Sequence, residues 1–337
     1  MRFNYSVIRN FRNFSGPELK TKWGPGINLI LGSNGSGKTN LLESLSVLCG
    51  WGGFTRTQNI LSWNVPARAE AFADVGGEES FKLSASIASR VSLRLNDKAI
   101  SFTDLRLVIP SIIFLTGGVS LIDGSPSARR LFIDRLCALL VPPYAKRLAD
   151  FKYVMRSRTA LLRQRKSPAP TTEIFCKLGG WIMERRREVL EMLKGVMKQD
   201  KFEMKFLPEL QTPGEEYLQR AIEEIKTREL HVMRPLVGPG YEELAITLRE
   251  NNKPVSEALS RGQKRRLILY MITTAGKLTA LKLKRKPILL FDDFTAELDA
   301  SGRDWTYKKL IETGCQVFIT APEDPFGKKR SITRYHL

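Results

Sequence analysis

INLILGSNGSGKTNLLESLSVL, residues 27–48, contains three features in a fixed order. Residues 27–31 form a short apolar run, and this composition predicts a buried strand. A glycine-rich loop follows at once. In residues 40–48, Leu41, Leu45 and Leu48 recur at helical spacing. The stretch therefore predicts a strand, a loop and a helix, which is the arrangement of a phosphate-binding loop.

The loop itself matches the pattern G-x-x-x-x-G-K-[ST]. The residues expected to bind the nucleotide are Gly32, Ser33, Asn34, Gly35, Ser36, Gly37, Lys38, Thr39 and Asn40. Glycines let consecutive backbone N–H groups face a phosphate, and the start of a helix favours an anion. Lys38 is expected to reach the β- and γ-phosphates of ATP, and the Thr39 hydroxyl to bind Mg²⁺. The alternative is a glycine turn without a ligand.

A second apolar strand, residues 288–291, ends in two adjacent carboxylates, Asp292 and Asp293. Adjacent carboxylates at the end of a buried strand need a cation or hydrogen-bond donors. We therefore expect Asp292 to bind Mg²⁺, directly or through water, and Asp293 to orient or deprotonate the attacking water. With Lys38, these two residues form the predicted catalytic set. The alternative is a capped strand end with two solvated acids.

A third motif, residues 259–263 (LSRGQ), stands at the start of a predicted helix with Ser260 as its N-cap. Ser260, Gly262 and Gln263 are candidates for a second anion site at this helix terminus. The use that we predict for it is to bind the γ-phosphate of ATP held by a second copy of the chain, so that ATP joins two copies. The alternative is a helix cap and a packing glycine without a ligand.

Composition narrows the class of protein. The chain has 337 residues, of which 42% are hydrophobic and 26% charged, and these ordinary globular values exclude disordered and fibrous proteins. No apolar stretch is long enough to span a membrane, and no secretory signal is visible. The chain has four scattered cysteines and two histidines, which argues against a disulfide scaffold and against a Cys/His metal site. We therefore expect a cytoplasmic protein without a membrane partner.

Positive charge is concentrated in one region. The formal net charge is +19, and residues 125–205 contain 19 Lys and Arg against 8 Asp and Glu. Two amphipathic helices are expected there, separated by the proline-rich turn at residues 167–172, and we interpret them as an antiparallel helical arm with basic outer faces. Such a surface favours a polyanionic partner, although an ordinary solvated helix layer explains it equally well.

The order of the three motifs resembles an ATP-binding-cassette head, and further motifs resemble the RecF family of bacterial recombination mediators over nearly the whole chain. The fold implied is α/β: a P-loop ATPase lobe of residues 1–116 and 285–337, and a mainly helical second lobe of residues 117–284 that carries the basic arm and the third motif. The most specific match, to G-S-P-x-x-R-R-x-F-L-D, lies in residues 124–135. The other matching segments are residues 10–16, 26–44, 53–57, 153–162, 260–265 and 292–299.

Some positions depart from the family pattern. Residues 240–243 read GYEE where the family has His-Arg-Asp-Asp, and residues 116–118 read TGG where it has Pro-Glu-Asp. Arg261 and Thr159 replace a glutamine and an asparagine that are common there. Asp293 stands where cassette ATPases commonly have glutamate, and its shorter side chain predicts slow hydrolysis. We therefore interpret the chain as a divergent member.

The resemblance implies a protein of recombinational repair and replication-fork maintenance. It would bind double-stranded DNA at gaps or at single-/double-strand junctions, form a homodimer on ATP, act as a weak, DNA-stimulated ATPase, and assist recombinase loading with RecR- and RecO-type mediators. The basic side chains offered for DNA contact are Arg129, Arg130, Arg158, Arg163, Arg165, Arg185, Arg186 and Arg187, with structural packing an equal alternative for the first two. The competing function is the ATPase subunit of a membrane transporter, which shares the three motifs.

Overall fold

The computed structural model describes residues 2–15, 17–52, 67–75, 79–88, 90–114, 121–197, 201–294 and 298–337. The chain divides into two compact units. Unit 1 consists of Met1–Gly118 together with Ser260–Leu337, and unit 2 is the continuous segment Val119–Leu259 between them. No helix in the described ranges is both long and apolar enough to cross a membrane.

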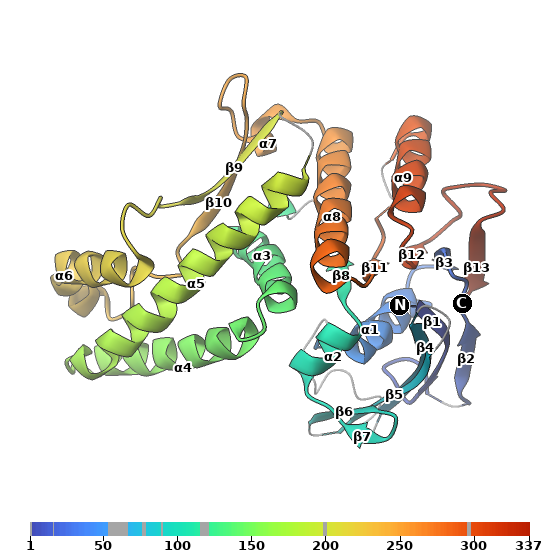
Figure 1. Ribbon diagram of the computed structural model, residues 1–337, viewed down its shortest axis with the longest axis horizontal. Helices are drawn as coiled ribbons and strands as arrows, with labels where there is room; N and C mark the ends of the chain where they lie inside the picture. Colours follow the sequence, from blue (N-terminus) through green and yellow to red (C-terminus); the bar gives the residue numbers. More distant parts are fainter. Residues whose placement is uncertain are drawn as a thin grey trace. The chain divides into compact units, whose positions relative to one another are not determined.

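A five-stranded parallel sheet forms the centre of unit 1 (Figure 1). Its strands, in spatial order, are β13 (Ile332–His336), β3 (Ile27–Leu31), β12 (Val317–Ala321), β11 (Ile288–Phe291) and β8 (Ser111–Phe114). Every residue of β3, β11 and β12 is buried, as expected for inner strands of a parallel sheet that is covered on both faces. All carboxyl ends of the strands therefore lie at one edge of the sheet.

A second, antiparallel sheet completes unit 1. Its order is β2 (Leu19–Lys22), β1 (Arg2–Arg9), β4 (Ala67–Val75), β5 (Glu79–Ile87), β6 (Val91–Leu95) and β7 (Lys98–Ala99). Helix α1 (Lys38–Leu48) contacts strands of both sheets and lies between them (Figure 1). The remaining helices are α2 (Phe102–Val108), α8 (Arg261–Leu283), which packs on β8, and α9 (Ala300–Thr313), which packs on α8.

Unit 2 is mainly helical. Its elements are α3 (Pro126–Leu140), α4 (Tyr144–Arg163), α5 (Ala169–Val196), α6 (Gly214–Val232), α7 (Val255–Ala258) and a two-stranded ladder of β9 (Phe202–Leu207) with β10 (Glu243–Leu248). Helices α5 and α6 come very close, because a Cβ on Gly180 would lie 2.2 Å from the backbone nitrogen of Glu215. Only glycine allows that approach.

The expected α/β fold with a helical second unit is confirmed, including the strands at residues 27–31 and 288–291 and the two arm helices. The arm turn is shorter than expected, since α5 begins at Ala169 and contains Pro170 in its first turn, where proline is tolerated. The boundary between the units also differs: Ser260–Leu337 belongs to unit 1, so α8 joins the sheet-bearing unit, because it packs on β8 and α9. Several motif positions lie outside the described residues, namely Gly16, 53–57, 116–118 and Glu297.

Candidate functional site

The glycine-rich loop connects β3 to α1 at the carboxyl edge of the parallel sheet. Gly35 and Gly37 have φ angles of +87° and +104°, a region that glycine adopts without strain. The ammonium group of Lys38 folds over the loop and donates to the carbonyls of Gly32 (2.7 Å) and Ser33 (2.8 Å). The loop therefore has the curvature that a phosphate cradle requires, with a cation placed over it.

Residues 12 and 13, which are not among the predicted site residues, support the loop. Asn13 donates from its amide to the Ser36 carbonyl (3.2 Å) and accepts from the Asn40 amide (2.6 Å). Arg12 forms a two-point ion pair with the fully buried Glu43 of α1, with 2.9 Å between Nη2 and Oε1. Asn40, predicted to bind nucleotide, thus holds the loop in place through Asn13.

The two motifs that are far apart in sequence meet at this edge. Thr39 Oγ1 donates to Asp292 Oδ1 at 2.9 Å, although the residues are 253 positions apart. Asp292 directly follows β11, and its backbone N–H donates to the Phe114 carbonyl at 2.9 Å. The predicted juxtaposition of the loop hydroxyl with the first carboxylate is therefore present.

Thr320, at the end of β12, is a further residue of the site. Its hydroxyl donates to Asp292 Oδ1 (2.7 Å) and accepts from the backbone N–H of Asp293 (2.8 Å). The Thr320 side chain is fully buried. Asp293 has a φ of +47°, a region that non-glycine residues enter at a cost and that often occurs at functional sites. The Thr320 hydroxyl therefore fixes both carboxylate-bearing residues; its place at a strand end was the only signal in the sequence.

A magnesium ion fits the side chains gathered here. A hydroxyl and a carboxylate oxygen 2.9 Å apart, Thr39 Oγ1 and Asp292 Oδ1, are the hard oxygen ligands that Mg²⁺ prefers. In the loop, the Ser36 hydroxyl oxygen is buried and has no hydrogen-bond partner among the described residues. An orphaned hydroxyl inside a phosphate-type loop is consistent with a phosphate oxygen as its partner.

The third motif begins α8 as predicted. Ser260 is the N-cap, and its side chain accepts from the Gln263 N–H (3.4 Å), while Gln263 Oε1 accepts from the Ser260 N–H (2.9 Å). Both residues are exposed, and a Cβ on Gly262 would meet no atom within 4 Å. The motif is therefore a capping box that presents an open, exposed helix terminus.

Two arginines join this helix to the segment after Asp293. Arg265 donates to the Phe294 carbonyl, and Arg266 donates to the Ser301 hydroxyl at 3.0 Å. Arg266 also lies 3.7 Å from Asp299, the N-cap of α9. The start of α8 is thus connected to the carboxylate segment by direct hydrogen bonds.

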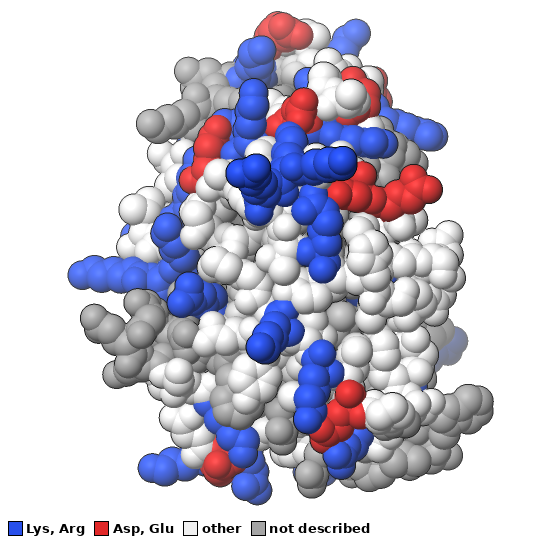
Figure 2. Space-filling view, turned by 90° about the vertical axis from the view of Figure 1, so that its right-hand side faces the viewer, with Lys and Arg blue, Asp and Glu red and all other residues white. Residues whose placement is uncertain are grey.

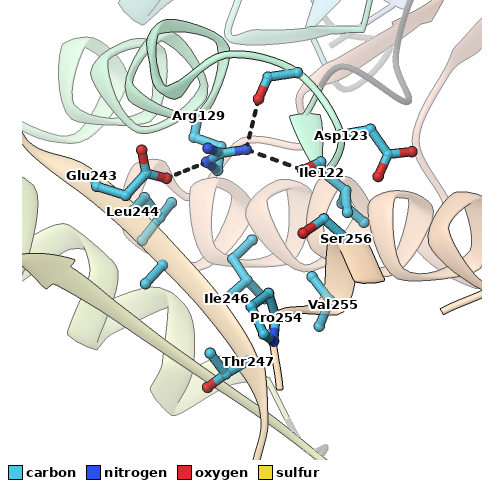
Figure 3. A pocket seen from close by; sticks show the side chains of 12 residues that line it. Ile122, Asp123, Arg129, Glu243, Leu244, Ile246, Thr247, Pro254, Val255 and Ser256 are labelled. Carbon is cyan, nitrogen blue, oxygen red and sulfur yellow. Dashed lines mark hydrogen bonds and ion pairs between the residues drawn. The ribbon is translucent and has the colours of Figure 1, made fainter. Parts of the chain in front are cut away.

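The G-S-P-x-x-R-R block builds unit 2 internally. Arg129 donates to Glu243 Oε1 (2.6 Å) and to the carbonyls of Ile122 and Gly124 (both 3.1 Å), and Figure 3 shows these contacts. Ile122, Gly124 and Arg129 line one side of a cavity of about 290 Å³, and residues of β10 and α7 line its other walls. Because this guanidinium is engaged within the unit, the packing alternative for Arg129 is favoured over DNA contact.

Other basic residues offered for DNA contact are also internal, and the expectation of outward-facing arginines is wrong for them. Arg158 is 1% exposed and pairs with Glu229 at 2.6 Å. Arg186 is 3% exposed and pairs with Asp134 and Glu242. The remaining members of this internal group are Arg130, which donates to the Glu242 carbonyl, and Arg187, which pairs with the Glu242 carboxylate.

Arg186 and its partners Asp134 and Glu242 show how a charged side chain is accommodated inside unit 2. Burial lowers the pKa of the Arg186 guanidinium, but Asp134, Tyr144 and Glu242 raise it more, so that the net shift is upward. The guanidinium therefore stays charged inside unit 2, compensated by its acidic neighbours. Glu242 lies in the segment that departs from the family pattern, and there it accepts from two arginines.

Comparison with known sequences gives three similarities. An AAA domain family model matches residues 7–124. The DNA replication and repair protein RecF of Shewanella piezotolerans is 30% identical over 96% of this chain and 92% of its own length. RecF of Heliobacterium modesticaldum is 27% identical over 95% and 92%, respectively.

Solved structures agree on the fold. The recombination mediator protein RecF-ATPrS of the RecFOR pathway superposes with a TM-score of 0.86, at 22% identity, over 100% of this chain and 96% of that one. An Smc head bound to the C-winged helix domain of ScpA superposes with a TM-score of 0.53, at 16% identity, over 97% and 91%.

Proposed function

This chain belongs to the RecF family of DNA replication and repair proteins, and on that premise we propose that it is an ATP-dependent, duplex-DNA-binding recombination mediator. One observation carries the proposal: the hydroxyl after the loop lysine and the first carboxylate after β11 meet at 2.9 Å. This contact brings a phosphate cradle and a hydrolytic carboxylate pair to the same edge of the sheet, which ATP hydrolysis requires.

The residues divide the chemistry among themselves. The backbone N–H groups of residues 33–39 bind the phosphates, and Lys38 neutralises their charge. Asp293 orients the attacking water and accepts its proton. Thr320 keeps Asp292 and Asp293 in position. A bound Mg²⁺, held by Thr39 and Asp292, supplies charge stabilisation at the transferred phosphate.

The exposed terminus of α8 is the element that would recognise ATP on a second copy. Ser260 and Gln263 satisfy each other within the capping box, which leaves further N–H groups of the first helical turn, that of Gly262 included, for an anion. Arg265 and Arg266 link this terminus to the segment that follows Asp293. ATP would therefore close a homodimer, and hydrolysis would open it.

Partners follow from the family. The similar solved structure is named for the RecFOR pathway, so we assign RecO- and RecR-type mediators to this chain as partners, and recombinase loading at gapped DNA in the cytoplasm as its task. Asp293, with its short side chain, supports slow, DNA-stimulated turnover. Family membership favours this function over that of a transporter ATPase subunit.

Fluorescence anisotropy of a labelled duplex tests the proposal. Titration with ATP should give tighter binding than titration without nucleotide, and Lys38→Ala should remove the difference. Asp293→Asn should retain ATP-tightened binding and the ATP-dependent dimer while phosphate release stops. An absence of duplex binding in every nucleotide state would overturn the proposed function.

A further inference from the structure

The internal pairing of several arginines of unit 2 leaves open which surface contacts the duplex. Arg129, Arg158 and Arg186 are engaged inside unit 2. Cations that pair with carboxylates of their own chain are poor phosphate contacts, because each contact must first break an existing ion pair. A DNA surface requires exposed cations without acidic partners.

The face seen in Figure 2 does not meet this requirement throughout. Acidic side chains lie among the basic ones near its upper and lower ends. Elsewhere in unit 1, Arg9 pairs with Glu18, and Lys329 pairs with Asp304. Some of the positive charge of unit 1 is therefore compensated by neighbouring carboxylates.

A different set of cations gathers at the amino edge of the parallel sheet, opposite the nucleotide site. The amino-edge cluster consists of Lys277, Lys282, Lys284, Arg285, Lys286, Lys308 and Lys309. Its members lie on the end of α8, on the link to β11 and on the last two turns of α9. Within residues 277–286 and 308–316, Glu312 is the only acidic residue.

Contacts show that these segments lie together. The Ile288 N–H at the start of β11 donates to the Pro110 carbonyl before β8, and the Val317 N–H at the start of β12 donates to the Gly26 carbonyl before β3. The Lys286 ammonium lies where a Cβ on Gly314 would be 2.5 Å away. The link before β11 and the end of α9 therefore form one surface.

Most of the cluster has no acidic partner. All members except Lys309, which is half-buried and pairs with Glu312 at 2.7 Å, are exposed. Arg285 donates to the Val108 carbonyl. In the described part of the chain, Lys282, Lys284 and Lys286 form no ion pair. Lys277 and Lys308 also form none within 4 Å, although they act electrostatically on Glu312 and Asp304, respectively. Cations at a helix C-terminus also stabilise the helix dipole, but that effect falls off within the last turn and does not account for Lys286 or Lys308.

We propose that the amino-edge cluster binds the phosphate backbone of duplex DNA. The inference rests on the proposed function and adds the surface by which it is performed. The cluster lies at the amino ends of the neighbouring strands β11 and β12, and neighbouring strands are about 4.8 Å apart. This separation exceeds the rise of about 3.4 Å between successive phosphates of one DNA strand, so the cluster can contact more than one phosphate. Leu281, 68% exposed, and Ile311, 43% exposed, belong to the same two helix ends and provide apolar contact for deoxyribose. Because the nucleotide site is at the opposite edge, DNA and ATP do not compete for the same groups.

The test compares two variants with equal charge removal. In the edge variant, Lys282, Lys284 and Lys286 are changed to Gln; in the arm variant, the exposed Arg163, Arg165 and Lys166 are changed to Gln. Duplex affinity is measured by anisotropy at several salt concentrations. Three lost phosphate contacts should reduce the magnitude of the log–log salt slope by about 2.7, and the arm variant should retain the wild-type slope.

Each result has a distinct meaning. A wild-type protein without salt-dependent duplex binding would overturn the proposed function itself. A steep wild-type slope that is unchanged in the edge variant would overturn only the surface assignment and leave the cluster to an acidic protein partner. Equal losses in both variants would also overturn it, as an effect of net charge. Binding of a fluorescent ATP analogue and the unfolding temperature, both unchanged, verify that the edge variant is folded.

Discussion

Removal of the Arg158 guanidinium should destabilise unit 2 without weakening DNA binding. Arg158 joins three helices: Nη2 donates to Glu229 Oε2 of α6 (2.6 Å), and Nη1 donates to Thr172 Oγ1 of α5 (2.7 Å). Both members of the ion pair are 1% exposed. Glu229 accepts one further hydrogen bond, from the Leu236 N–H at 2.9 Å.

The magnitude follows from the charge left behind. Arg158→Ala leaves the Glu229 carboxylate buried with a single donor, and breaking a buried pair in this way costs about 3–5 kcal/mol. The double variant Arg158→Met with Glu229→Gln removes both charges and keeps an acceptor for Leu236. Because no uncompensated charge remains, it should recover about 2 kcal/mol or more of that loss.

Hydrogen exchange measured by mass spectrometry reports the opening free energy of α4, α5 and α6 separately from unit 1. Arg158→Ala should accelerate exchange in these helices, and the double variant should restore much of the protection. Duplex affinity, measured below the unfolding transition, should stay within threefold of wild type. Unchanged protection together with a large loss of DNA affinity would refute the assignment of Arg158 to the interior.

Three further predictions concern unit 1 and the thiols. Thr320→Val should lower ATP turnover about 10–100-fold and leave ATP affinity within threefold, because only the hydroxyl orients the two carboxylates. Thr320→Ser keeps the hydroxyl and should restore turnover. A loss of ATP affinity as large as the loss of turnover would contradict this positioning role. Gly37→Ala should weaken ATP binding more than Gly35→Ala. Both glycines have a positive φ, but only at Gly37 would the new Cβ meet a side chain, that of Asn13 at 2.6 Å. Equal ATP-binding constants of the two variants in calorimetry would argue against this steric reason. Burial raises the pKa of the Cys49 thiol to about 12 and that of Cys176 to about 11, so native protein at pH 8 should react slowly with a disulfide reagent and unfolded protein should titrate all 4 cysteines. The same shifts should make stability fall as the pH rises above the ordinary thiol value of 9.0, and rapid reaction of native protein at pH 8 would show that the thiols are accessible.

Local patterns in the sequence were sufficient to predict the candidate nucleotide site at the carboxyl edge of the parallel sheet. Residues 27–48 encode a strand, a loop and a helix within one continuous segment, and β11 is an apolar run that ends in two acids. For this reason the pairing of Thr39 with Asp292 was predictable across 253 positions. In contrast, α2 (Phe102–Val108) was not predicted, because its helical signal is a single N-cap, Ser101, which accepts from the Asp104 N–H.

Side-chain partners that are remote in sequence were not predictable. Periodicity identifies the buried face of α4, but nothing local indicates that Arg158 meets an acid 71 positions away. The ladder of β9 with β10 was missed for the same reason, because α6 lies between the two strands. Thr320 acquires its role only when β12 is placed beside β11.

The order of strands in the parallel sheet has a consequence for biosynthesis. β3 is flanked by β12 and β13, and the Asn28 side chain contacts the carbonyl of Val317, 289 positions later. At about 5–20 residues per second, translation leaves this early strand without its neighbours for about 15–60 s. Unit 2 is continuous and is complete well before then, so it can fold while the sheet cannot. The nascent amino-terminal segment therefore exposes an apolar strand with two unpaired edges during that interval, and chaperone binding at residues 27–31 should protect it until the last strands arrive.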